Sequence, residues 1–201
     1  SDATIRVAPG LYDRVVNLGL DDTFWRDMRA MHMVVDMTRT GIRVDLDWMR
    51  QMSEELSRLK EGKEREIEEQ VARCEALAFQ QWLEGERGNP PPQEPIRGSI
   101  NPGSAPQVYK LVFEDLGVRW TGKGPPSTND KILARIAEGS GGEGGLPEAD
   151  RVVQLIRDWR GLSKLQTSYA DAIPQRVDSD GRVRSRFRMT RTATGRLSSS
   201  D

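Results

Sequence analysis

The sequence is poor in the residues that build disulfides, metal centres and histidine-dependent active sites. Its 201 residues include one cysteine, Cys74, and one histidine, His32. A single cysteine excludes an internal disulfide and is typical of a reducing compartment. The chain also has no zinc-ligand spacing, no Walker-type glycine loop and no Ser/His/Asp constellation. We therefore interpret both residues as packed helix residues, and the sequence indicates binding rather than catalysis.

Long apolar runs are also absent. Apolar residues make up 36% of the chain and charged residues 30%, and no segment approaches the eighteen or so apolar residues of a membrane span. The first ten residues, SDATIRVAPG, lack the basic and then apolar pattern of a signal peptide. We therefore expect a cytoplasmic protein with no membrane partner, long enough for one large or two small domains.

The net charge of −1 hides an uneven distribution. Residues 151–201 carry eleven Lys or Arg against five Asp or Glu, whereas residues 1–150 carry nineteen against twenty-six. Six of the arginines lie between Arg182 and Arg196, with no acid among them. A basic C-terminal quarter on an acidic body predicts one surface that binds a polyanion.

Helical periodicity dominates up to about residue 170. A first helix is predicted over 23–40, with Thr23 as its N-cap and Gly41 as its stop. A short extended piece precedes a helix from about 46 to 83, which at about 1.5 Å per residue is too long for one small core. The apolar seam expected on this long helix consists of Met49, Met52, Leu56, Leu59, Ile67, Val71, Cys74 and Ala78.

A Pro/Gly-rich loop over 85–99 separates this helix from two short helices. The first is expected to begin with a capping box formed by Ser104 and Gln107, and the second with Ser127 or Thr128 as its cap. A second long helix is predicted to start at Pro147 and could pack antiparallel to the first. Its apolar stripe is Val152, Leu155, Ile156, Trp159, Leu162, Leu165 and Tyr169.

Beyond Pro174 the pattern changes to the period of two that is typical of a strand. Its alternation predicts that Val183, Phe187 and Met189 face a core, and a second short strand could include residues 195–197. The opposite face would carry Arg182, Arg184, Arg186 and Arg188. Guanidinium groups crowded on one face repel each other unless an anion lies between them, and arginine is suited to forked bonding with phosphate.

Two other charged groups have simpler interpretations. Arg157, Arg160 and Lys164 form a basic ridge on the second long helix, which together with the strand predicts contacts to backbone phosphates. The acidic pairs Asp45/Asp47 and Asp178/Asp180 could bind a metal, but capping and turn chemistry already explain them.

The last ten residues, TATGRLSSSD, resemble the segment that precedes the catalytic palm in family A DNA polymerases. Upstream stretches resemble other parts of that family in the same order: 33–56 the entry to the thumb, 100–118 and PSTNDKILARI the thumb-tip helices, 158–177 the last thumb helix, and 180–187 the following strand. The resemblance implies a mainly α fold, in which two long antiparallel helices with short tip helices form a thumb and a small C-terminal β element belongs to the palm. Residues 1–45 would form an N-terminal segment and entry helix at the palm/thumb base, 46–170 the thumb, and 171–201 the start of the palm.

The resemblance also implies a DNA-binding role. Arg196 matches an arginine that reaches the minor groove near the primer terminus, Thr194 a neighbour on the same strand, and Arg160 and Lys164 thumb contacts to the duplex backbone. Minor-groove acceptors occupy similar places in all Watson–Crick pairs, so a cation there senses pair geometry and not sequence. The predicted DNA-binding residues are Arg160, Lys164, Arg186, Arg188, Thr194, Arg196, Ser198 and Ser199.

This sequence departs from the family pattern in two ways. Arg184, Arg188 and Arg191 stand where relatives often carry His, Asn or a small residue, which indicates either tighter backbone contact or pairing with acids elsewhere in the palm. The chain also ends before the family's metal-binding aspartates, so we expect no cofactor and no activity by itself, whereas the intact polymerase would use two Mg²⁺. The remaining palm and fingers would be its partner, on the same chain or a second one.

Two rival interpretations remain open at this point. One is a non-enzymatic helical interaction module, with residues 47–83 as the partner-binding arm. The other is a general nucleic-acid-binding protein whose basic strand evolved separately.

Overall fold

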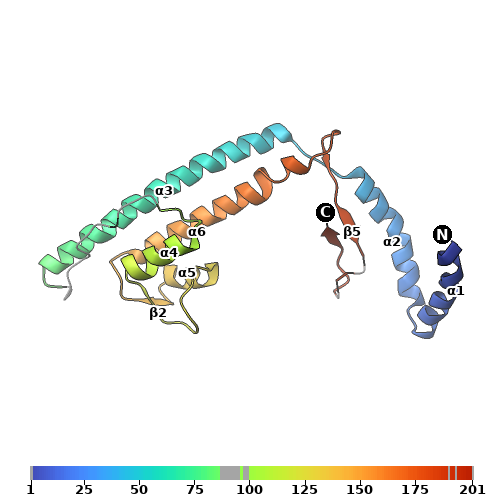
Figure 1. Ribbon diagram of the computed structural model, residues 1–201, viewed down its shortest axis with the longest axis horizontal. Helices are drawn as coiled ribbons and strands as arrows, with labels where there is room; N and C mark the ends of the chain where they lie inside the picture. The colour runs from blue at the N-terminus through green and yellow to red at the C-terminus, as the bar shows by residue number, and fades with distance from the viewer. Residues whose placement is uncertain (1, 87–95, 97–99, 190, 193, 201) are drawn as a thin grey trace. The chain divides into compact units, whose positions relative to one another are not determined.

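The computed structural model describes residues 2–86, 96, 100–189, 191–192 and 194–200. The chain divides into two compact units, residues 47–172 and residues 1–46 together with 173–201. Both are built mainly from helices, and the strands pair into short two-stranded sheets (Figure 1). The mainly α fold class expected from the sequence is therefore confirmed. No helix in the described ranges is both long and apolar enough to cross a bilayer.

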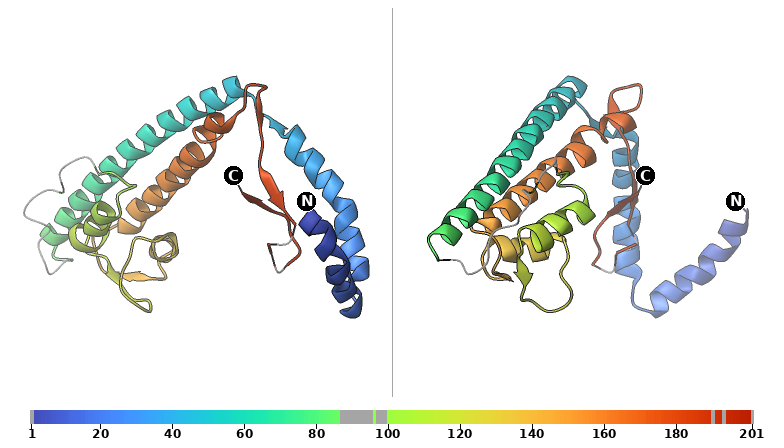
Figure 2. Two further views of the ribbon diagram at one scale, coloured as in Figure 1. Left: turned by 45° about the vertical axis from the view of Figure 1, so that its right-hand side comes forward. Right: turned by 60° about the vertical axis from the view of Figure 1, so that its left-hand side comes forward.

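The helical unit, residues 47–172, is organised around two long helices. Glu64 contacts Trp159, Ser57 contacts Gln166 and Ser53 contacts Asp171. Because the residue numbers rise on one helix as they fall on the other, the helices are antiparallel, and both views of Figure 2 show them side by side. The elements are α3 (Leu46–Leu83), α4 (Ala105–Tyr109), the π-helix η1 (Lys110–Asp115), β2 (Arg119–Trp120), α5 (Asp130–Ala137), β3 (Gly142–Glu143), α6 (Ala149–Leu165) and the π-helix η2 (Gln166–Ala170).

The hydrophobic core of this unit lies where the C-terminal half of α3 meets α6 and the short helices. The predicted seam residues Ile67, Val71, Cys74 and Ala78 are all buried there. They pack with Val108, Leu111, Val112, Leu116, Leu133, Ile136, Val152, Val153, Ile156 and Trp159. Burial raises the pKa of the Cys74 thiol to about 11, so this side chain behaves as a small apolar residue at neutral pH.

The N-terminal half of α3 meets η2 through polar side chains instead. Gln166 donates to Ser57 Oγ at 2.7 Å and accepts from Lys60 Nζ at 3.1 Å. Ser53 Oγ donates to Asp171 at 2.6 Å. We call this group, Ser53, Ser57, Lys60, Gln166 and Asp171, the polar seam.

Leu59 is 47% exposed, so its predicted place in an apolar seam is wrong. Helical steps of three and four from the buried Leu56 reach Lys60 and Glu64 before Ile67, which turns Leu59 away from α6. On α6 the predicted stripe is buried at Val152, Ile156 and Trp159. It ends before Leu165 and Tyr169, which are each 50% exposed.

The starts of the shorter helices differ from the predicted caps. Ser104 forms no side-chain cap hydrogen bond, because Gln107 accepts from the Asn101 backbone N–H instead of closing a capping box. Asn129, rather than Ser127 or Thr128, caps α5 by accepting from the Ile132 N–H.

Helix α6 begins at Ala149 and not at Pro147, because Glu148 adopts a left-handed conformation with φ of 58°. Its carboxylate accepts from the buried Gln70 at 2.9 Å and pairs with Arg73 at 3.1 Å. These contacts lower the pKa of Glu148, the bond from Gln70 most of all, and they hold the strained residue in place.

Helix α3 carries nine acidic residues against six basic ones. Much of this charge faces solvent, including the carboxylates of Glu54, Glu55, Glu61, Glu66, Glu68 and Glu69. This outer acidic face lies on the same helix as the buried seam.

The second unit, residues 1–46 and 173–201, contains two helices and two short sheets. Tyr12, Phe24 and Trp25 form a cluster of edge-on rings where α1 and α2 meet. The sequence pattern does not indicate α1, whose interior holds Pro9, a residue that removes a helix hydrogen bond. The elements are α1 (Asp2–Asn17), α2 (Asp21–Thr40), β1 (Ile42–Arg43), the 3₁₀ turn η3 (Pro174–Arg176), β4 (Arg182–Val183), β5 (Arg186–Arg188) and β6 (Ser198–Ser200).

Gly41 ends α2 as predicted, with φ of 63°. Thr23 is not the N-cap, because α2 already begins at Asp21. The strand that follows Gly41, β1, pairs antiparallel with β4, and β5 pairs antiparallel with β6. The predicted second strand therefore lies at 198–200 rather than 195–197.

Candidate nucleic-acid interface

The basic run does not form one continuous strand. Residues 184–185 interrupt it, so that Arg182 lies in β4 and Arg186 and Arg188 lie in β5, in two different sheets. The expectation that four arginines share one strand face is therefore wrong. The run is divided because its first part pairs with β1 over only two residues, whereas the part after residue 185 pairs with β6.

Arg182 and Arg184 are occupied by contacts within their own unit. Arg182 Nη1 donates to the carbonyl oxygens of Thr40 and Gly41 at 3.2 and 3.3 Å. Arg184 donates to Asp178 at 2.7 Å and to Asp180 at 2.5 Å. The bonds to Asp180 and Asp178 raise the pKa of Arg184, and the bond from Arg184 lowers the pKa of Asp180.

In the folded chain, carboxylates from outside this acid-free run therefore contact one of its arginines. Asp178 and Asp180 hold Arg184 at the turn that ends at Gly181, whose N–H donates to the Asp178 carbonyl. Their interpretation as turn residues agrees with these contacts. Across the described ranges, no group of three His, Cys, Asp or Glu side chains could hold a metal ion.

The hairpin β5–β6 presents its two arginines on one face. Arg186 lies opposite Ser200 and Arg188 opposite Ser198, and directly opposed residues share a face of an antiparallel sheet. Both arginines are exposed. Phe187 and Ser199 belong to the other face, so Ser199 is on the opposite side from Ser198.

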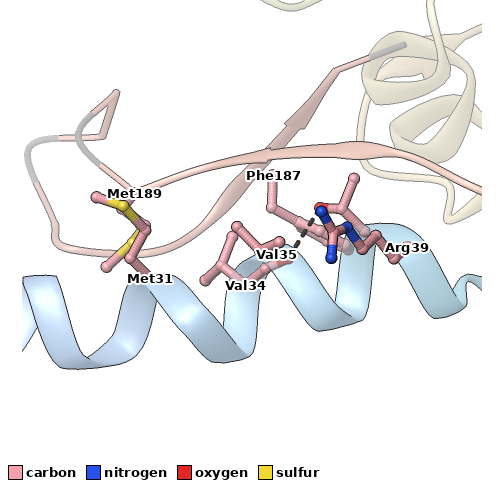
Figure 3. A pocket seen from close by; sticks show the side chains of 7 residues that line it. Met31, Val34, Val35, Arg39, Phe187 and Met189 are labelled. Atoms are coloured by element: carbon pink, nitrogen blue, oxygen red, sulfur yellow. Dashed lines mark hydrogen bonds between the residues drawn. The ribbon is translucent and has the colours of Figure 1, made fainter.

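Apolar contacts with α2 fix the orientation of this hairpin. Figure 3 shows Phe187 and Met189 beside Met31 and Val34 of α2. Together with Val35, Thr38 and Arg39 they line a cavity of about 460 Å³. Because Phe187 points toward α2, its neighbours Arg186 and Arg188 point away from it.

The segment between β5 and β6 is shaped by a turn. The Gly195 N–H donates to the Thr192 carbonyl at 3.2 Å, with Gly195 at φ of 71°. Thr192 Oγ1 in turn donates to the Arg196 carbonyl. These bonds fix the backbone of Arg196, while the side chains of Thr194 and Arg196 are exposed.

The predicted residues of the helical unit, Arg160 and Lys164, both lie on α6. Arg160 is half-buried, and its guanidinium donates to the carbonyls of Pro102, at 2.8 Å, and Thr128. Burial lowers the pKa of Arg160. The side chain therefore joins the loop before α4 to the loop before α5.

Its neighbours on the predicted basic ridge differ from one another. Arg157 pairs with Asp130 at 2.9 Å. Lys164 is exposed and makes no ion pair with the residues that the structure describes. The ridge thus combines two side chains with internal partners and one that faces solvent.

Sequence reasoning missed these internal partners of the arginines. The Asp180–Arg184 pair has a local signal, since the two residues are four apart across a turn. The carbonyl groups that bind Arg160 and Arg182 have none, because they belong to segments more than thirty residues away.

The model of DNA polymerase family A matches residues 57–201. The thermostable DNA polymerase I of Thermus aquaticus is 31% identical over 170 residues, which cover 84% of this chain and 17% of that protein. The DNA polymerase of Bacillus phage SP01 is 29% identical over 196 residues, covering 85% of this chain and 20% of that protein.

A solved structure is similar in fold. The POL domain of Pol1 from M. smegmatis, in complex with DNA primer-template and dNTP, aligns with a TM-score of 0.67 and 21% identity, over 98% of this chain and 30% of that one. The chain thus spans about a fifth of the length of the curated relatives above. The match over more than half of its residues shows that the chain belongs to DNA polymerase family A.

Proposed function

We propose that this chain is the DNA-binding thumb part of a DNA-directed DNA polymerase, together with the start of its palm, and that it grips a primer–template duplex. The observation that carries the proposal is the hairpin β5–β6. It presents Arg186, Arg188 and Arg196 to solvent, and none of the three forms an ion pair with any described residue. The solved relative in complex with DNA primer-template and dNTP has the same fold.

Arg196 is the proposed minor-groove residue, with Thr194 beside it on the same strand of the duplex. The turn bonds at Thr192 and Gly195 hold the backbone here, so a guanidinium group can be presented with little loss of backbone entropy. Acceptors in the minor groove are nearly independent of sequence. Such a contact suits an enzyme that must hold every sequence it copies.

The other predicted residues would bind phosphates. Arg186 and Arg188 are exposed on one face of the hairpin. The hydroxyl of Ser198 beside them is buried, and Ser199 lies on the face that Phe187 turns toward α2, so the two arginines and not the predicted serines would make these contacts. Lys164 adds an exposed cation on α6. For Arg160 the contacts favour a positioning role, because its guanidinium holds together the loops that precede two helix N-termini, where backbone N–H groups attract anions.

The same proposal assigns the two units. Residues 46–170 would be the thumb, residues 1–45 the segment and entry helix at the palm/thumb base, and residues 171–201 the start of the palm. Helix α2 and the strand β1 next to it expose apolar side chains that the remaining palm and fingers could cover, with exposed fractions of 57% for Met33, 40% for Met37 and 73% for Ile42. The intact polymerase would add deoxynucleotides with two Mg²⁺, and we assign no metal ligand to the described residues.

Salt-dependent binding tests this function. Fluorescence anisotropy would be measured with labelled primer–template, blunt duplex and single-stranded DNA between 50 and 200 mM salt. We expect duplex binding with little sequence preference and a steep salt dependence. Lys164→Ala and Arg186→Ala should each lower the slope of log K against log salt by about 0.9.

The matched control is Arg50→Ala, which removes an exposed arginine of α3 that pairs with Asp47. It should leave the slope unchanged. Equal affinity for single strands, or no affinity for duplex, would contradict the proposed function and favour a helical interaction module or a general nucleic-acid-binding protein.

A further inference from the structure

The six arginines between residues 182 and 196 fall into two groups according to what their guanidinium groups contact. Arg182 and Arg184 are bound to backbone carbonyls and to two carboxylates. Arg186, Arg188, Arg191 and Arg196 are exposed, and within the described part of the chain none of them has an ion-pair partner. The hairpin β5–β6 and its turn therefore carry four uncompensated positive charges.

Two of these four, Arg188 and Arg191, are three residues apart in the sequence. Arg188 ends β5, and Arg191 follows three residues later in the segment that leads to the turn. Arg186 lies two residues before Arg188 on the same face, at about 6.6 to 6.8 Å for two strand residues. Phosphates of one DNA strand rise by about 3.4 Å each along the helix axis, so the spacing of Arg186 and Arg188 matches two such steps.

Among the residues that the structure describes, no carboxylate pairs with these four side chains. Arg186 and Arg188 lie opposite the uncharged Ser200 and Ser198, so the cations on this face repel one another when nothing is bound. A polyanion removes this repulsion, and arginine forks match phosphate oxygens.

We propose that Arg191 adds a phosphate contact next to that of Arg188, and that this pair lets the protein hold DNA at higher salt than Arg186 and Arg196 would without it. This rests on the proposed function, since it takes the same duplex as ligand. The competing explanation is that the two arginines pair with acidic side chains elsewhere in the polymerase.

The experiment compares the wild-type protein with its Arg188→Asn/Arg191→Ala variant. A fluorescent primer–template of fixed sequence is titrated at five salt concentrations from 50 to 200 mM. Two phosphate contacts contribute a slope of about 1.8, so the ratio of wild-type to variant affinity should fall about twelvefold over this range. Arg188→Lys/Arg191→Lys should restore the wild-type slope, because lysine keeps both charges.

A charge-matched control is Arg58→Asn/Arg65→Ala, which removes two exposed arginines from the acidic face of α3. It should leave the salt slope unchanged. If it lowers the slope as much, net charge and not local contact is responsible, and the inference is wrong.

The remaining outcomes separate the explanations. If wild-type protein binds the duplex but the hairpin variant keeps its slope, the phosphate contacts are refuted while the proposed function stands. A variant that keeps its slope but unfolds at lower temperature would indicate pairing with acidic side chains within the protein. If wild-type protein binds no duplex, the proposed function fails first.

Discussion

The polar seam allows a quantitative test of how the two long helices hold together. Gln166→Ala removes the bond to Ser57 Oγ at 2.7 Å and the bond from Lys60 Nζ at 3.1 Å. A neutral hydrogen bond contributes about 0.5 to 1.5 kcal/mol and one to a charged group somewhat more. Because Gln166 is only half-buried, we work with the lower ends of these ranges and expect a loss of about 2 kcal/mol.

Urea unfolding followed by far-UV circular dichroism measures this loss. With an m-value of about 2 kcal/mol per molar urea, the midpoint should fall by about 1 M. The matched control is Gln51→Ala on α3, where the glutamine is exposed, and its effect should stay within about 0.5 kcal/mol.

A double variant tests the mechanism behind the number. Ser57→Ala combined with Gln166→Leu removes both partners, so no donor is left without an acceptor between these two side chains. We expect this pair to cost less than the sum of its single variants. Strict additivity, or a Gln166→Ala variant as stable as Gln51→Ala, would refute the reasoning that this seam stabilises the helix pair.

Two further predictions concern packing. Gly41→Ala should destabilise the pairing of β1 with β4 by about 2 kcal/mol or more, because its φ is 63° and the new Cβ would lie 2.6 Å from the Val183 carbonyl oxygen. Gly62→Ala, in an open part of α3, should instead stabilise the protein by up to about 1 kcal/mol. Chemical denaturation measures whether each variant lowers or raises the free energy of unfolding. Cys74 should react with a thiol reagent at pH 8 only as fast as the helical unit opens, and a reaction as fast as that of a free cysteine would contradict its burial. Because its folded pKa of about 11 is raised above the unfolded value, its contribution to stability should be lost as the pH rises from about 9 through 11.

The helical spacing of apolar residues predicted the buried face of α3 in the helical unit. Ile67, Val71, Cys74 and Ala78 repeat in steps of three and four, and all four are buried. Their spacing alone defines a face, whichever partner covers it. The end of α2 at Gly41 was also predictable, because a glycine after a periodic segment supplies the left-handed residue that ends a helix.

The parts that could not be predicted depend on which segments meet in space. Leu59 fits a seam by spacing, but the polar residues of η2 favour Lys60 and Ser57 in its place. Arg160 fits a solvent-exposed ridge, but its guanidinium binds the Pro102 and Thr128 carbonyls. The sequence pattern of the basic run does not predict that Asp178 and Asp180, which precede it, form ion pairs with Arg184.

The acidic face of α3 has a kinetic consequence for any polyanion that approaches the helical unit. Exposed carboxylates such as Glu54, Glu61 and Glu68 line its outward side, whereas Lys164 lies on the antiparallel partner α6. Under the proposed function, a diffusing duplex would be repelled by the acidic face of α3 and attracted by Lys164, so collisions with the acidic face would be short-lived. If the proposed function is correct, the helix that supports the core would therefore also orient DNA electrostatically before the first specific contact forms.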